Sequence, residues 1–205
     1  MDKNGVRAIL GYLSYIIRHK WYVFLECCKL GIPWLGIIHD LSKFLPSEWL
    51  PYARYFYGEW PTAEQANRQF PFGTVRTKED VEYEFDVAWL HHQHRNKHHW
   101  QRWLLTLDSA RSDGKLFPLP MPDKYRREML ADWRGAGRAY GNPDTAGWYS
   151  KQIENDQMIL HPDTQDWIEK QLWPLMGICA TCNGVSPVEA WDKKRGCPKC
   201  GAPRR

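Results

Sequence analysis

Histidine is concentrated at two places in this chain. His39 directly precedes Asp40, and five of the eight histidines fall between positions 91 and 99. Imidazoles and carboxylates are ligands that transition-metal ions prefer in proteins. Burying such groups without a partner costs several kcal/mol, and a shared cation is an economical partner because it supplies the compensating charge. The sequence therefore predicts a site for one or two divalent ions, with manganese, iron, zinc and cobalt as candidates.

Two further residues are candidate ligands. His19 lies at the edge of an apolar helical face, with Ile16 three residues before it and Val23 four residues after it. Asp132 lies between Ala131 and Trp133 in a segment with the pattern of a buried helix. The simpler interpretations are a hydrogen-bonded core histidine and an aspartate paired with a nearby arginine of the same helix.

The histidine run is predicted to continue a long helix. Residues three, four and seven positions apart share one side of a helix. If the apolar members of one such stripe face the core, His92 and His99 face inward with them; the stripe is Phe85, Trp89, His92, Asn96 and His99. We expect the other histidines of the run to be solvated or at a pocket rim; these are His91, His94 and His98.

Four cysteines near the C-terminus form a second candidate site. Cys179 and Cys182, then Cys197 and Cys200, are two CxxC pairs separated by fourteen residues. Each pair can turn two sulfurs toward one tetrahedral ion, which predicts a structural zinc site. Two disulfides and a four-cysteine iron site are the alternatives. The lysine and arginine side chains of this segment could also contact nucleic acid.

Composition indicates an ordinary globular chain. Its 205 residues are 43% hydrophobic and 25% charged, and no apolar run approaches the roughly 20 residues that cross a membrane. No secretory signal is apparent, so a cytoplasmic protein without a membrane partner is expected. The net charge of +4 falls entirely within residues 176–205, where six bases face two acids. Twelve tryptophans are expected mainly to fill a helical core.

The spacing of apolar residues predicts an all-α domain over residues 1–175 and a small zinc-ribbon module over 176–205. Proline and glycine mark the breaks between helices. A capping signal at Thr77 and Asp80 should begin the helix that carries the histidine run. The expected helices are 6–30, 34–44, 46–57, 78 into the nineties, 123–140 and 162–175.

The order of these residues resembles the HD-domain superfamily of metal-dependent phosphohydrolases. In that superfamily a helical histidine, a His-Asp doublet and a distant aspartate bind one ion, which implies His19, His39, Asp40 and Asp132 here. Further histidines bind a second ion, which implies His92 and His99. The segments around positions 39–44, 92–100 and 129–139 also resemble an uncharacterised family of bacteriophage and Firmicute proteins, over most of residues 10–170.

These features predict hydrolysis of a phosphate ester, of a nucleotide or a related small molecule, by metal-activated water. Asp40 would anchor or bridge the ions, and Lys43 and Arg95 would hold phosphate oxygens, although surface salt bridges would also explain both bases. A nucleic-acid-binding protein or nuclease, acting through the ribbon and the Arg-rich segment 125–138, is one alternative. A phage or host interaction protein without catalysis is another. The same ligand types suit an oxygen-activating iron site, and the sequence leaves substrate and oligomeric state open.

Overall fold

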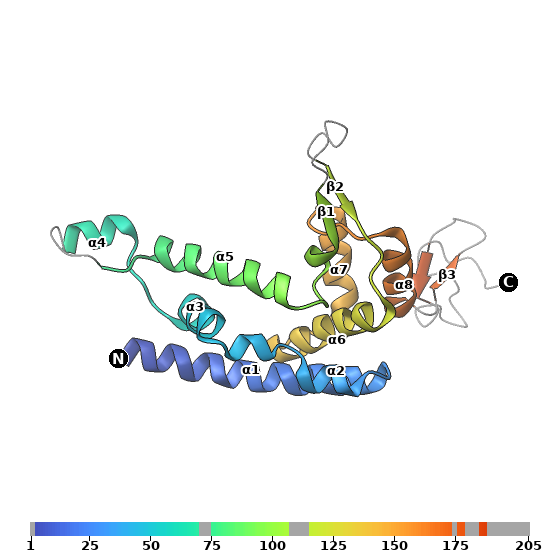
Figure 1. The fold of residues 1–205 in the computed structure, drawn as a ribbon, viewed down its shortest axis with the longest axis horizontal. Coiled ribbons are helices and arrows are strands. Elements are labelled where there is room, and N and C mark those ends of the chain that lie inside the picture. Colours follow the sequence, from blue (N-terminus) through green and yellow to red (C-terminus); the bar gives the residue numbers. More distant parts are fainter. Residues whose placement is uncertain (1–2, 70–74, 107–114, 174–175, 179–184, 188–205) are drawn as a thin grey trace, which may run out of the picture.

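The computed structural model describes residues 3–69, 75–106, 115–173, 176–178 and 185–187, and this part of the chain is mainly helical (Figure 1). The all-α prediction is thereby confirmed for the body of the protein. The elements are α1 (Lys3–Lys29), α2 (Pro33–Ile38), η1 (Leu41–Phe44), α3 (Pro46–Tyr57), α4 (Ala63–Gln69), α5 (Lys78–Arg95), η2 (Trp100–Trp103), β1 (Leu104–Thr106), β2 (Leu116–Pro118), α6 (Asp123–Tyr140), α7 (Thr145–Glu154), α8 (Pro162–Leu172), β3 (Met176–Ile178) and β4 (Val185–Pro187).

Helix α1 is the element around which the others are arranged. It packs against α2, α3 and α6, and α5 packs on α3 (Figure 1). Buried side chains from α1, α3 and α5 form one core cluster, which contains Tyr12, Ile16, Tyr52, Ala53 and Ala88. A second cluster joins α6 to α7, α8 and the segments that flank them. The first cluster therefore holds α1 and α5 in place, and the second holds α6; these three helices carry His19, His92 and Asp132.

Helix α6 approaches α1 closely at a glycine. A Cβ atom at Gly135 would lie 2.4 Å from Val23 Cγ2 and 2.8 Å from the Val23 backbone nitrogen. Val23 and Ala131 are both fully buried in this interface. A side chain at position 135 would separate the helices, so glycine sets the distance between His19 on α1 and Asp132 on α6.

The chain breaks between α2 and η1, at the histidine and aspartate of the doublet. A single helix over 34–44 was expected, and that prediction is wrong: Asp40 adopts a left-handed backbone conformation with φ 54° and ψ 29°. Lys20 on α1 donates to the carbonyl oxygens of Ile37 and His39, at the end of α2. Non-glycine residues in this conformation cluster at functional sites, where surrounding contacts over-determine them.

Other helix predictions fare well. The helices 46–57 and 123–140 match α3 and α6, and Thr77 and Asp80 form a capping box at the start of α5. Helices α4 and α7 and the antiparallel pair β1–β2 were not expected. In that pair, Leu104 is opposite Pro118 and Thr106 is opposite Leu116.

The predicted ribbon module falls mostly outside the described residues. Strands β3 and β4 pair antiparallel at its beginning. Cys179, Cys182, Cys197 and Cys200 lie outside the described residues. Among the helices that the structure does describe, none has the length and apolar content needed to cross a membrane.

Candidate metal centre

Four separate parts of the chain bring histidines and aspartates into the interior. His19 lies on α1, Asp132 on α6, and the doublet between α2 and η1. His92 lies in the last turn of α5, and His98 and His99 follow that helix before η2. The imidazoles are all at most 9% exposed, and Asp40 is 1% exposed. Such burial requires a compensating partner for these groups.

The first group contains His19, His39, Asp40 and Asp132. These are the four residues that the resemblance to the HD-domain superfamily implies for one ion site. His19 Nε2 lies 3.4 Å from Asp40 Oδ2 and 3.3 Å from Asp132 Oδ1. His39 Nε2 lies 3.3 Å from each of the same two oxygens. Two imidazole nitrogens and two carboxylate oxygens therefore surround one point.

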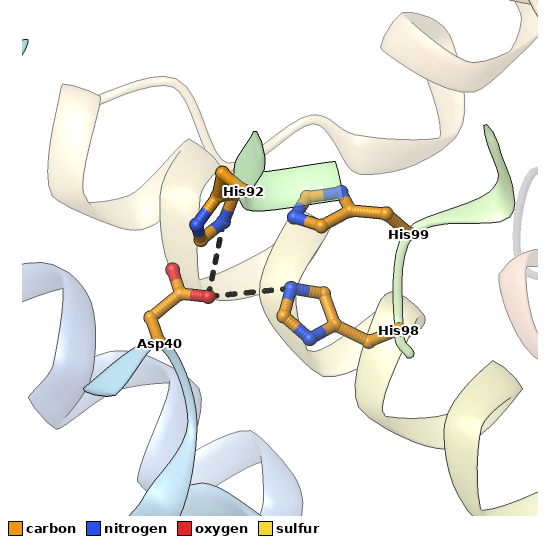
Figure 2. A group of neighbouring side chains, drawn as sticks. All are labelled: Asp40, His92, His98 and His99. Atoms are coloured by element: carbon orange, nitrogen blue, oxygen red, sulfur yellow. Dashed lines mark ion pairs between the residues drawn. The ribbon is translucent and has the colours of Figure 1, made fainter. Parts of the chain in front are cut away.

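The second group contains Asp40, His92, His98 and His99 (Figure 2). Asp40 Oδ1 lies 3.2 Å from His92 Nε2 and 3.4 Å from His98 Nε2, and Figure 2 shows both contacts meeting at one oxygen. Because Oδ2 faces the first group, the Asp40 carboxylate is shared between the two groups, one oxygen for each.

These distances fit a shared ion better than direct hydrogen bonds. Ligands about 2.0 to 2.2 Å from a metal are separated from each other by about 3 to 3.5 Å. The Nε2 atoms of all five imidazoles, and Oδ1 of Asp40, are buried without a hydrogen-bond partner among the described residues, whereas Oδ2 of Asp40 pairs with Lys43. Buried polar atoms are almost always satisfied in proteins. A pair of cations would satisfy all six of the unpartnered atoms together.

Two glutamates orient the imidazoles from the opposite side. Glu128 Oε1 lies 3.1 Å from His39 Nδ1 and 3.3 Å from His98 Nδ1. Glu48 Oε2 lies 2.8 Å from His92 Nδ1. Metal-bound histidines characteristically donate their second ring N–H to a carboxylate, which fixes the tautomer and the ring orientation. In the neutral forms of His39, His92 and His98, this arrangement leaves the Nε2 lone pairs directed toward the two groups.

The electrostatics of the centre favour charged carboxylates. Burial by itself would raise the pKa values of Asp40 and Asp132, but His39 and the other neighbouring imidazoles hold both pKa values well below the ordinary range. Burial lowers the pKa of His19, and burial together with His98 and His92 keeps the pKa of His99 well below its usual value. For His39 and His92, burial is outweighed by the neighbouring Asp40 carboxylate, which raises both pKa values. Metal ligation requires ionised aspartates and neutral imidazoles, so an ion that binds here displaces the protons of His39 and His92.

The two predicted phosphate-binding bases have different surroundings. Lys43 is buried, and its Nζ lies 2.6 Å from Asp40 Oδ2. Burial opposes its charge, yet Asp40 and Asp132 raise its pKa, so the ammonium group remains charged. Arg95 instead forms an ion pair with Glu48, 2.5 Å away, and also binds Ser47. It thus holds the carboxylate that orients His92.

A cavity of about 290 Å³ opens onto both groups. Lys43, His19 and Asp132 line it beside the first group, and His99 lines it beside the second. The rest of its wall is mostly aromatic: Tyr15, Tyr52, Phe56, Phe85, Trp89 and Tyr140. The Asp132 side chain is 14% exposed, so solvent reaches the centre from this side.

Three residues of the candidate metal centre escaped the sequence analysis. His98 was expected at a solvated or rim position, and that prediction is wrong: it is 1% exposed and faces Asp40. The reason is that α5 ends at Arg95, where Asn96 leaves the helical conformation, so helical spacing does not govern His98. Glu128, one helical turn before Asp132, and Glu48 were not considered. Their positions near ligand-bearing segments were the available signal.

Comparison with known proteins gives a family without an activity. No curated protein and no solved structure matches the chain. Residues 8–173, which carry both groups of candidate ligands, match the model of DUF5662, a family of unknown function, and the chain therefore belongs to that family.

Proposed function

We propose that the protein is a metal-dependent phosphohydrolase whose helical body is an HD-like bundle holding two divalent ions. The observation that carries the proposal is the Asp40 carboxylate, which directs one oxygen to each of two clusters of unpartnered imidazole nitrogens. His19, His39 and Asp132 would complete the first ion site. His92, His98 and His99 would complete the second. A carboxylate shared by two transition ions is a common basis for hydrolytic catalysis.

The ions, when bound, lower the pKa of a coordinated water and neutralise charge on phosphoryl oxygens. The residues around the cavity do the remaining work. Lys43 lines the cavity beside Asp40, so its ammonium group binds a phosphoryl oxygen of the substrate. Asp132 directs Oδ1 toward the imidazoles of the first group, and Oδ2 lies 3.9 Å from His98 Nε2, so this carboxylate would serve as a ligand of the ion.

The reaction is the hydrolysis of a phosphate ester. Water attacks phosphorus and releases a proton to the solvent in the cavity, the bond from phosphorus to the ester oxygen breaks, and the departing oxygen takes up a proton from solvent. The products are inorganic phosphate and an alcohol. A cavity of about 290 Å³ with a mostly aromatic wall suits a small molecule.

Nucleic acid is a poorer candidate because the arginines of the Arg-rich segment already have partners within the protein. Arg126 and Arg127 bind Asp123, on their own helix. Arg138 pairs with Glu26 on α1, and Arg134 donates to the Gln171 carbonyl oxygen on α8. Arg134 and Arg138 thus connect α6 to α8 and α1, while Arg126 and Arg127 share one carboxylate on their own helix. For the four cysteines we keep the structural zinc site as the proposal, separate from catalysis.

The test uses the full chain, stripped with a chelator and reloaded with Mn²⁺, an ion that favours histidine and carboxylate over thiolate ligands. A panel of phosphate monoesters and diesters would be assayed with wild-type protein and with Asp132→Asn. The matched control is Asp123→Asn, an exposed aspartate on the same helix. We expect Asp132→Asn alone to lose bound manganese and activity. Wild-type protein that binds ions only through its cysteines would refute the proposal.

A further inference from the structure

A second cavity, of about 310 Å³, adjoins the first one. Its wall is formed by the last part of α6, by α7 and by the segment between them. Ala136 and Tyr140 line both cavities. Since Asp132, Ala136 and Tyr140 are four residues apart on α6, they form one ridge that runs from the metal centre to the second cavity.

Aromatic rings continue this ridge toward the metal centre. The Tyr140 ring lies 4.8 Å from the Tyr15 ring, and Tyr15 stacks on His19 with 5.7 Å between ring centroids. Tyr140 is 62% exposed, so it separates the two cavities at the surface without closing either. A ligand longer than one cavity can therefore pass over Ala136 and beside Tyr140. Together the two volumes fall within the roughly 300–1,000 Å³ of small-molecule sites.

The second cavity differs from the first in its chemistry. Two indole rings, of Trp133 and Trp148, meet edge to face at 5.2 Å and form its apolar wall. Asn142, Asp144 and Thr145 supply amide, carboxylate and hydroxyl groups beside them. No lysine or arginine is among the described residues that line it. Such a cavity does not favour a phosphate, but it suits a ring with hydroxyl groups, which can stack on indole and donate to oxygen acceptors.

From this difference between the two cavities we infer how the substrate binds. The second cavity binds the uncharged, hydroxyl-bearing ring of the alcohol part of the phosphate ester, and the first cavity binds the phosphoryl group. The inference rests on the proposed function and narrows the substrate class to phosphate monoesters of cyclic polyols, such as sugars and nucleosides. Lys43 supports this choice. Of the described residues around the first cavity it is the only lysine or arginine, and it already pairs with Asp40, so a polyphosphate chain would lack partners.

The kinetic test compares ring-bearing and ring-free substrates in the Mn²⁺-loaded full chain. The ring-bearing probes are glucose 6-phosphate, ribose 5-phosphate and adenosine 5′-monophosphate, and the ring-free probe is glycerol 3-phosphate. Trp148→Ala should raise KM about 5- to 10-fold for at least one ring-bearing probe, as expected for a lost aromatic contact. The KM for glycerol 3-phosphate should stay within about 2-fold. The matched control, Trp34→Ala, removes an exposed indole on α2 and should change neither value.

A binding measurement keeps the inference independent of turnover. Nuclear magnetic resonance of the indole N–H groups, assigned with Trp148→Phe, would follow titration with methyl glucoside, ribose and adenosine, without phosphate or metal. We expect the Trp148 signal to shift with the probe that responds kinetically. Ala136→Leu, which fills the junction of the cavities, should reproduce the KM effect if Trp148→Ala unfolds.

The outcomes separate the two proposals. An indole shift without phosphatase activity would overturn the proposed function and leave the ring site standing. Activity with equal Trp148 dependence for all four phosphate esters, and no indole shift, would overturn the ring site and leave the proposed function standing.

Discussion

Glu128 contacts an imidazole in each of the two groups. Its substitution should therefore lower the affinity for both ions. Its Oε1 lies 3.1 Å from His39 Nδ1, in the first group, and 3.3 Å from His98 Nδ1, in the second. In Glu128→Gln the amide keeps nearly the same shape but loses the charge. Loss of such an outer carboxylate typically costs 10- to 100-fold in metal affinity. Since each group has one imidazole held by Glu128, we expect a loss of about 1.4 to 2.7 kcal/mol for each ion.

The assay is a calorimetric titration of the chelator-stripped full chain with Mn²⁺, which thiolates bind poorly. Glu84→Gln is the matched control, because Glu84 pairs with Arg54 and Arg76 at the surface, away from the centre. The control should keep wild-type affinity for both ions. If Glu128→Gln also kept wild-type affinity, Glu128 would not orient metal ligands and our interpretation of the outer carboxylates would fail. A loss confined to one ion would refute the shared role.

Three further predictions concern stability. Gly135→Ala should lower the free energy of unfolding in urea by about 1 to 3 kcal/mol, despite the better helix propensity of alanine, because the new methyl group would overlap Val23; equal or higher stability would show that α1 and α6 can separate freely. Thr77→Ala removes the capping box of α5 and should cost about 1 kcal/mol, measured in the same way, with Mn²⁺ affinity unchanged; a change in affinity would mean that the start of α5 helps to place His92. Chelator should lower the melting temperature of wild-type protein more than that of Asp40→Asn, since a ligand that binds only the folded state stabilises it; identical shifts in both proteins would contradict a shared Asp40.

For residues within regular helices, the sequence could predict which side chains face the interior. His19, Asp132 and the helix that carries Asp132 follow apolar spacing closely, and α3 and α6 have the expected bounds. The His39-Asp40 doublet was identified from residue types alone. Its geometry was not, because Asp40 adopts a left-handed conformation beside a His39 carbonyl oxygen that accepts from Lys20 on another helix, and no local pattern signals either feature.

The remaining features depend on contacts between distant segments. His98 belongs to no helix, so its direction is fixed by Glu128 and Asp40 and by no local periodicity. Glu48 and Glu128 are ordinary helical acids until the fold places an imidazole against each. The short α7 begins after Asp144, which caps it through the Gly147 backbone N–H, a signal weaker than the apolar stripe of a long helix.

The central claim is that two cations share the Asp40 carboxylate inside the helical body. Crystals of the Mn²⁺-loaded full chain, measured on both sides of the manganese absorption edge, test it most directly. We predict two anomalous peaks about 3.5 to 4 Å apart, one beside His19, His39 and Asp132 and the other beside His92 and His98. Anomalous density confined to residues 176–205, with none near Asp40, would contradict the account.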